Sequence, residues 1–187
     1  MRETPYREAM VRPADDNRLV WIDLELVVGD EAGDLDDQLE LVDPGIDVVV
    51  HQPPDVLDRM DDFVRTMHTK SGLIKEIEAS TIDLTTAGRQ VLDYIRGHVP
   101  AAGTTPLCGN SIGTDRRFLA EHLREIDDYL HYRSIDVSSL KELCRRWYPE
   151  AYKNKPAKSE QHRALDDIKE SVAELRYYRE TILKPPE

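Results

Sequence analysis

The amino-acid sequence predicts an α/β domain in which a mixed β-sheet is flanked by helices. Short segments rich in Val, Ile and Leu alternate with longer segments of helical periodicity, which is typical of that class. The chain has 187 residues, enough for a single domain with a substantial core but few for two. Hydrophobic residues make up 40% and charged residues 33%, a balance that argues against a disordered chain.

The first part of the chain predicts an arm and two strands. We expect residues 1–17 to form a flexible N-terminal arm and residues 18–183 to form the domain. Residues 18–26, RLVWIDLEL, predict a buried strand because apolar and β-branched residues dominate them. Residues 46–51 predict a second strand, and the acidic residues 29–45 between the two predict a loop or a hairpin.

The rest of the chain predicts mainly helices, with two further strands. Apolar spacing of three and four residues predicts helices over residues 61–69, 73–79, 85–98, 112–126, 138–147 and 162–183. Residues 106–109 and 132–137 predict strands, and the lysine-rich residues 149–160 predict a loop.

The charge of the chain restricts its partners. The net charge is −12, which argues against a binder of long nucleic acid, because that function needs a broad basic surface. Residues 1–62 hold 18 acids and 5 bases, whereas residues 133–163 hold 8 bases and 4 acids. An acidic body with one basic strip favours a short anionic ligand, although a solvated helix face next to a basic loop would give the same pattern.

Cysteine usage and hydropathy indicate a cytoplasmic protein. Cys108 and Cys144 lie in apolar segments without metal-type spacing, as expected of buried free thiols in a reducing compartment. Residues 1–16 hold no apolar stretch typical of a secretory signal, and no apolar run is long enough to predict a membrane helix.

Asp23 and Glu25 lie inside the most hydrophobic predicted strand. Side chains two residues apart share one face of a strand, so the two carboxylates project together. Two buried like charges are costly unless a cation neutralises them, and hard divalent cations prefer carboxylate oxygens. The pair therefore indicates a metal site, although an Asp-x-Glu pair is also common by chance in a chain with 37 acids.

Asp115 and Asp167 supply two more carboxylates. Gly109 and Gly113 bracket a tight strand-to-helix connection, which directs Asp115 at the helix start toward the strand ends; a plain N-terminal aspartate favoured by the helix dipole is the alternative. Residues five apart on a helix diverge by about 140°, so His162 and Asp167 converge only if His162 precedes the helix. Solvated charges at a helix start are again the alternative.

Together, four carboxylates and a histidine are what two-metal phosphodiester hydrolysis requires. Two divalent cations about 4 Å apart hold the attacking and leaving oxygens, and a histidine that titrates near neutral pH can take the proton of the attacking water.

The order Asp-x-Glu, Asp, His-x4-Asp resembles the DEDDh exonucleases, which have an RNase H-like fold. Five longer stretches narrow the resemblance to the oligoribonuclease family: VWIDLE, MDDFVRTMHTKSGL, PLCGNSIGTDRRFL, HYRSIDVSSLKELCRRWYPE and HRALDDIKESVAELRYYRE. The resemblance runs from residue 20 to about residue 180. It implies a 3′→5′ exoribonuclease that degrades dinucleotides and other very short RNAs with two Mg²⁺ or Mn²⁺ ions. In that family pattern Asp23, Glu25, Asp115 and Asp167 bind the metals and His162 is the general base.

The resemblance also implies substrate contacts and a homodimer. His68 matches a histidine that packs on the terminal bases, and Tyr132 matches a tyrosine that reaches into the neighbouring subunit's site. Ser111, Arg133 and Ser138 match residues that hold the 5′-phosphate end, for which hydroxyls and a guanidinium are suited. Without the resemblance, Tyr132 could be a core aromatic and Arg133 a surface charge.

The chain departs from the family pattern directly after Glu25. The family continues with a Thr-Gly-Leu-type turn and a further strand, whereas here LVVGDEAGDLDD follows. We expect this loss to expose an edge of the sheet and to remove a leucine that separates the two bases in the family. Two hypotheses therefore stand: an active exoribonuclease, or an impaired relative that binds dinucleotides or other partners. A DNA-directed proofreading exonuclease is a weaker third.

Overall fold

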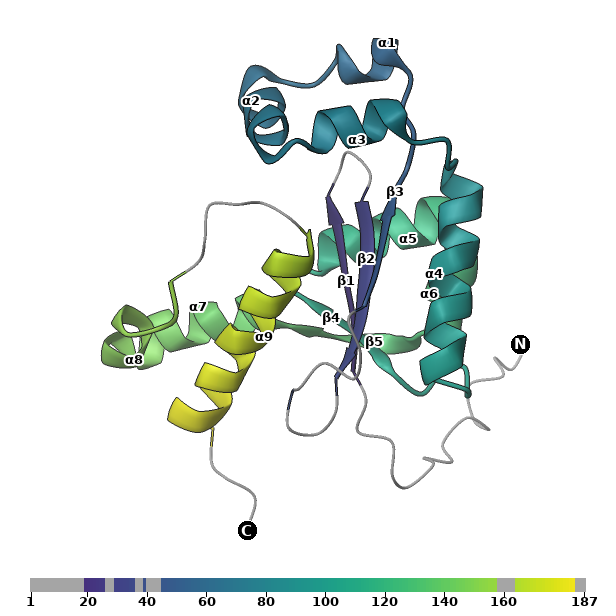
Figure 1. Cartoon of the computed structure of the whole chain (residues 1–187). Coiled ribbons are helices and arrows are strands. Elements are labelled where there is room, and N and C mark those ends of the chain that lie inside the picture. Colours follow the sequence, from purple (N-terminus) through teal and green to yellow (C-terminus); the bar gives the residue numbers. More distant parts are fainter. Residues whose placement is uncertain (1–18, 26–28, 36–38, 40–44, 158–163, 184–187) are drawn as a thin grey trace, which may run out of the picture.

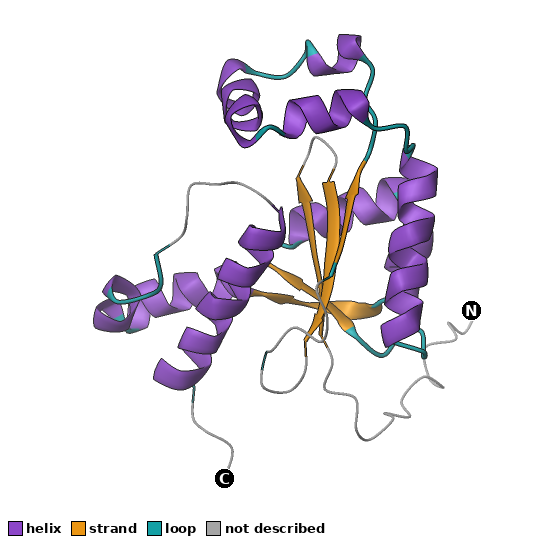
Figure 2. Cartoon of the chain, viewed as in Figure 1, coloured by secondary structure: helices purple, strands orange, loops and turns teal. Residues whose placement is uncertain are grey.

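The computed structural model describes residues 19–25, 29–35, 39, 45–157 and 164–183, with the backbone alone for residues 19, 21–25, 29–35, 164 and 165. The proposed arm, residues 1–17, lies outside this part. Helices cover both faces of a five-stranded sheet, which confirms the α/β class (Figures 1 and 2). The strands are β1 (Leu19–Glu25), β2 (Gly29–Leu35), β3 (Ile46–Val49), β4 (Pro106–Gly109) and β5 (His131–Asp136).

The sheet is mixed, as the sequence predicts, and β1 lies at its centre. The strand order is β3-β2-β1-β4-β5. The pairs β1–β2 and β2–β3 are antiparallel, whereas β1–β4 and β4–β5 are parallel. Strand β1 therefore has a paired neighbour on each side: β2 along its whole length, and β4 at Val20 and Trp21.

The expectation of an exposed edge after Glu25 is wrong. Strand β2 occupies residues predicted as loop or hairpin, and it pairs with β1 from Leu19↔Leu35 to Glu25↔Gly29. Only residues 26–28 separate the last paired positions, a length suited to a short hairpin connection. The sequence GDEAGDL has weak β-propensity, so pairing with β1 and β3 accounts for the strand better than its composition does.

The described helices follow the predicted order with four differences. They are α1 (Pro54–Leu57), α2 (Asp62–Ser71), α3 (Leu73–Ala79), α4 (Leu84–His98), α5 (Gly113–His122), α6 (Arg124–Tyr129), α7 (Val137–Trp147), α8 (Pro149–Lys153) and α9 (Ala164–Thr181). The helix expected over residues 112–126 is broken at Leu123, whose φ of −132° is not helical. Helix α9 ends at Thr181, two residues earlier than expected.

Two short helices that the sequence analysis did not predict begin at prolines. Pro54 opens α1, and Pro149 opens α8 within the supposed loop 149–160. Proline suits the first turn of a helix because its fixed φ is already helical and it has no N–H to leave unpaired.

The two faces of the sheet carry separate apolar cores. Adjacent residues of a strand face opposite sides, and in β4 Leu107 packs with α4, α5 and α6 while Cys108 packs with α7 and α9. Both residues are fully buried. Figure 1 shows α4 and α6 on one side of the strands and α7 and α9 on the other.

Helices α2 and α3 form a unit beyond the end of β3. Leu57, Leu73 and Ile77 make a small core of their own against Val49 and Met60. Asp61 caps α2 by accepting a hydrogen bond from the Val64 amide at 2.9 Å.

Among the described residues, no helix has the length and hydrophobicity needed to cross a bilayer.

Candidate functional site

The site is built around the central strand. Asp23 and Glu25 lie near the C-terminal end of β1, at the register positions opposite Glu31 and Gly29 of β2. Their backbones are described and their side chains are not, so the shared carboxylate face stays a prediction. Both positions are paired with β2, whereas the pairing of β1 with β4 is confined to Val20 and Trp21.

Helix α5 brings Asp115 to this strand. A short connection after β4 leads into α5, which packs against β1, and Asp115 lies in its first turn. The aspartate is only 8% exposed. A buried carboxylate requires compensating charge or hydrogen bonds, and both a metal ion and the helix dipole, the alternative considered for this residue, would supply positive charge here.

Helix α9 brings Asp167 to the same strand. Asp167 lies in the first described turn of α9, which packs against β1 and β2. Asp167 is partly buried, whereas its neighbour Asp166 forms a surface ion pair with Lys169 at 3.7 Å. The two aspartates thus have different surroundings, as expected for adjacent residues that diverge on a helix.

His162 lies outside the described residues, ahead of the described start of α9 in the chain. No group of three metal-binding side chains occurs among those described, a set that lacks the side chains of Asp23, Glu25 and His162. The structure therefore brings the backbone of β1 and the helices of Asp115 and Asp167 together, and the convergence of the five side chains stays a prediction.

The structure places Ser111 and Ser138 directly side by side. Their hydroxyl oxygens are 3.2 Å apart, and the Ser111 amide donates to the Ser138 hydroxyl at 2.8 Å and to Asp136 Oδ1 at 2.9 Å. Ser138 lies in the first turn of α7, where Asp136 is the N-cap. Ser111 adopts a left-handed φ of 55°, uncommon for a residue other than glycine. We call Ser111 and Ser138 the serine pair.

Tyr132 and Arg133 lie in a bulge of β5. The register moves from Pro106↔His131 to Leu107↔Ser134, so these two residues are extra relative to β4. Tyr132 is 71% exposed, which makes the core-aromatic alternative wrong, and the Arg133 guanidinium lies over its ring at 5.3 Å. Bulges redirect side chains away from a sheet, and both residues are exposed here.

Arg116 stabilises the bulge from α5. Its Nη1 donates to the carbonyl oxygens of His131 at 2.9 Å and Arg133 at 3.2 Å, and to Ser134 Oγ at 3.1 Å. Its Nε pairs with Asp127 at 2.9 Å, and both side chains are about one-fifth exposed. Arg116 follows Asp115 directly in α5, so the same helix turn carries a proposed metal ligand and the arginine that contacts the bulge.

His68 lies apart from the serine pair, in the last turn of α2. The residue is 2% exposed and belongs to the α2–α3 unit rather than to an open surface. Its role in packing on bases stays a prediction.

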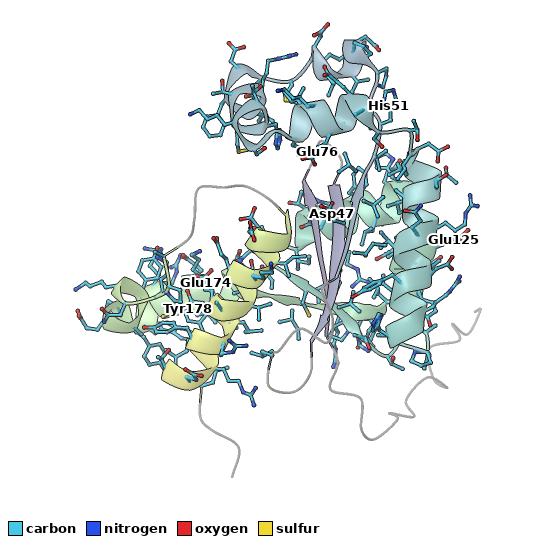
Figure 3. All side chains as sticks on the ribbon, viewed as in Figure 1. Asp47, His51, Glu76, Glu125, Glu174 and Tyr178 are labelled. Atoms are coloured by element: carbon cyan, nitrogen blue, oxygen red, sulfur yellow. The ribbon has the colours of Figure 1, made fainter. Side chains whose placement is uncertain are left out.

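Helices α7 and α9 are joined by a buried polar cluster behind the site. Lys141 Nζ lies 3.1 Å from Glu174 Oε1, and the Tyr178 hydroxyl donates to the same oxygen at 2.7 Å (Figure 3). Glu174 is 2% exposed and Tyr178 is fully buried. Burial, and then the hydrogen bond to Glu174, raises the pKa of Tyr178 above its ordinary value. Burial also raises the pKa of the Cys108 thiol, and both cysteines are free and buried, as predicted.

Three residues of this region were missed by the sequence analysis: Asn110, Arg116 and Asp136. Asp136 lies two residues before the predicted helix start at residue 138, and an N-cap aspartate there could have been anticipated. Arg116 and Asn110 act through contacts to residues 15 to 61 positions away, for which spacing within one segment gives no signal.

Comparison with known proteins identifies one family model and several similar proteins. The RNase_T family, described as exonuclease, matches residues 20–175 of this chain. An oligoribonuclease of Mycobacterium sp. (strain KMS) is 54% identical over 179 residues, which cover 91% of this chain and 83% of the relative. An oligoribonuclease of Streptomyces avermitilis is 51% identical over 178 residues, covering 90% and 88%. An oligoribonuclease of Rhodococcus jostii (strain RHA1) is 49% identical over the same length, covering 90% and 89%.

Proposed function

The chain belongs to the RNase_T exonuclease family and to its oligoribonucleases, and from that premise we propose that it hydrolyses very short RNAs from the 3′ end to 5′-mononucleotides. The contact between the hydroxyls of Ser111 and Ser138, 3.2 Å apart at the start of α7, is the observation that supports this best. It makes a compact polar end to the site, where a terminal phosphate rather than a continuing strand would fit.

The proposed 5′-phosphate subsite combines hydroxyls, a helix start and a cation. The N-terminal end of α7 carries partial positive charge and suits an anion. Arg133, exposed on the bulge of β5, supplies a guanidinium that can pair with phosphate oxygens. A substrate held at its 5′ end here and cleaved beside β1 can be only a few nucleotides long, which explains the preference for dinucleotides.

The donor set fits two divalent cations, Mg²⁺ or Mn²⁺. Asp115 is 8% exposed in a helix packed on β1, so a hard cation would offset the cost of burying its charge. We assign Asp23, Glu25, Asp115 and Asp167 as the ligands. When bound, such ions stabilise charge on the attacking and leaving oxygens of an in-line displacement.

The protein groups then have distinct tasks. His162 accepts the proton of the attacking water, a task for which an imidazole is suited. Ser111, Ser138 and Arg133 hold the 5′ phosphate, and His68 packs on a base. Arg116 holds the bulge that presents Arg133.

We also propose that the active form is a homodimer. Tyr132 is 71% exposed on the bulge, where its ring can reach a second copy of the chain, and Arg133 stacks on it from the same strand. In this arrangement Tyr132 supplies an aromatic surface for an unpaired base in the partner's site.

The test is a metal titration of dinucleotide hydrolysis with the purified full chain. We expect no turnover in EDTA, recovery with Mg²⁺ or Mn²⁺, and a rate that falls steeply as RNA length increases from two nucleotides. Hydrolysis that persists in EDTA would overturn the two-metal proposal, and equal rates on long RNA or DNA would overturn the substrate class.

A second candidate function is dinucleotide binding without efficient hydrolysis. It is favoured by residues 26–28, the only three residues between the paired ends of β1 and β2, where the family has a longer turn. Saturable binding of a 5′-phosphorylated dinucleotide in Mg²⁺, with no product at high protein concentration, would decide for this function.

A further inference from the structure

Asn110 lies between the serine pair and the helix that carries Asp167. Its Oδ1 accepts a hydrogen bond from the Ser138 hydroxyl at 3.1 Å, and its Nδ2 donates to Ser171 Oγ at 2.5 Å. Ser171 is 4% exposed and lies on α9. One rigid amide therefore connects the first turn of α7 to α9 across 61 positions of sequence.

The α9 end of this connection is close to the acidic site. Asp167 and Ser171 are four residues apart on α9, and residues at that spacing are neighbours on one helix face. A shift of Ser171 along or around the helix axis therefore displaces Asp167 by a similar amount.

The α7 end changes when a phosphate binds. A serine hydroxyl has a single proton to donate, and in this structure Ser138 donates it to Asn110. Phosphate oxygens only accept, so a phosphate held by Ser138 competes with Asn110 for that proton. Occupation of the serine pair thus alters the hydrogen bond that holds the Asn110 amide.

The next turn of both helices gives the connection a firm base. Lys141 lies three residues after Ser138, Glu174 lies three residues after Ser171, and the two form the buried ion pair. Tyr178, one turn further along α9, also donates to Glu174, and Figure 3 shows both α9 residues beside α7. The α7–α9 interface is therefore rigid behind the site. Any movement between the two helices is expected at the other end of this interface, where Asn110 lies.

We propose that Asn110 and Ser171 are positioning residues that couple the 5′-phosphate subsite to the first turns of α9, so that a held 5′ phosphate sets the position of Asp167 for cleavage. This rests on the proposed function, because it assumes that the serine pair binds phosphate and that Asp167 acts in hydrolysis. The residues touch each other and the site's side chains, not the reacting atoms.

The experiment uses Ser171→Ala in the full chain, which removes one hydroxyl and substitutes the best helix former. Thr181→Ala is the matched control, because Thr181 lies at the far end of the same helix and donates only within it, to the Tyr177 carbonyl at 2.6 Å. We measure kcat and KM on dinucleotides with a 5′ phosphate and with a 5′ hydroxyl.

Coupling predicts that the native protein has the higher kcat on the phosphorylated substrate. Ser171→Ala should lower that kcat ratio by about fivefold, the effect of one hydrogen bond, and Thr181→Ala should leave it unchanged. In a Ser138→Ala background, Ser171→Ala should change the ratio no further, since coupled residues are not additive. Equal loss of kcat on both substrates would show a structural role alone and overturn the proposal.

A second readout does not depend on turnover. Amide hydrogen exchange is followed in α9 with and without the 5′-phosphorylated dinucleotide in Ca²⁺. Ligand-induced protection of the first turns of α9 in the native protein, lost in Ser171→Ala, supports the coupling even if no hydrolysis occurs, in which case only the exoribonuclease proposal fails. Binding without any protection of α9 overturns the coupling while the exoribonuclease proposal stands.

Discussion

The two faces of the sheet are packed with different kinds of side chain. The face under α4, α5 and α6 is an apolar core whose members carry no charge; its strand and α4 contributions are Val20, Val48, Val50, Ala87, Val91, Leu92, Ile95 and Leu107. Among the described side chains, the face under α7 and α9 has fewer buried apolar residues, and its buried surroundings include Glu174, Ser171 and the hydroxyl of Tyr178.

We expect the apolar face to determine the stability of the fold and the polar face to determine the geometry of the site. Apolar burial stabilises the fold without specifying directions, because the hydrophobic effect is non-directional. A buried ion pair contributes little net stability over apolar packing, but its hydrogen bonds fix the distance between two helices. The α7–α9 side carries Ser138 and Asp167, which lie on different helices, so we expect activity to depend on that side and the free energy of unfolding mainly on the other.

The strongest test of this division is Asp167→Asn. Removing one carboxylate ligand should lower kcat on the dinucleotide by on the order of 10³-fold, which corresponds to several kcal/mol of lost transition-state stabilisation. The melting temperature should change little. The matched control is Asp166→Asn, because Asp166 pairs only with Lys169 at the surface among the contacts described. Equal losses in the two variants would contradict the assignment.

On the apolar face, Ile95→Ala should have the opposite profile. Ile95 is 1% exposed on α4, and loss of its side chain should lower the free energy of unfolding by about 3 kcal/mol. The kcat measured at low temperature on folded protein should stay near the native value. Urea denaturation measures the first effect, with the exposed neighbour Gln90→Ala as control. A large fall in kcat at unchanged stability would break the comparison.

Glu174→Gln sharpens the comparison from the polar side. It leaves Lys141 without its carboxylate partner, and we expect a loss of about 2 kcal/mol, below the range for fully buried pairs because the Lys141 side chain is 30% exposed. Glu142→Gln, which breaks an exposed pairing with Arg145 and Arg146, should barely change the urea midpoint. A Glu174→Gln protein as stable as the native one would show that this pair specifies geometry without stabilising the fold.

Tyr178→Phe gives the smallest expected effect, a change in pH dependence. The pKa of Tyr178 is raised in the folded state, whereas in the unfolded chain it loses its proton near pH 10. Above that pH the folded state binds more protons, so the free energy of unfolding falls as pH rises, by up to about 1.4 kcal/mol per pH unit for this group.

The measurement is urea denaturation at a series of alkaline pH values. Tyr178→Phe should have a shallower slope above pH 10 than the native protein, and the exposed Tyr148→Phe should keep the native slope. The Cys108 thiol, whose pKa is also raised, contributes a slope of the same sign in all three proteins. Parallel slopes for native and Tyr178→Phe would contradict the prediction.

The fold was predictable where a segment's own pattern determines its structure. Strand β4 and helix α3 match the predicted bounds, because apolar spacing and flanking glycines or prolines delimit them. Strand β2 was left open, as a loop or a hairpin, since GDEAGDL has weak β-propensity and its strand depends on pairing with β1 and β3. The break at Leu123 was also missed, because the apolar spacing continues through it while the backbone does not.

The sequence motifs and the family resemblance supply candidate residues for the site, but they do not supply their contacts. The acids and the serine pair follow from motifs, and the structure brings Ser111 and Ser138 together across 27 positions. The bulge at Tyr132 depends on register with β4, and the Asn110 bridge depends on α9. Both are long-range features that no local spacing encodes.

The left-handed backbone of Ser111 has a consequence for anyone who engineers this protein. Holding a serine at a φ of 55° costs on the order of 1–2 kcal/mol that glycine would avoid. A screen for thermal tolerance would therefore reward Ser111→Gly, and the winning variant would have lost one of the two hydroxyls at the proposed phosphate end. Selection for heat resistance alone would thus discard recognition, and a directed-evolution programme needs a dinucleotide assay beside its thermal one.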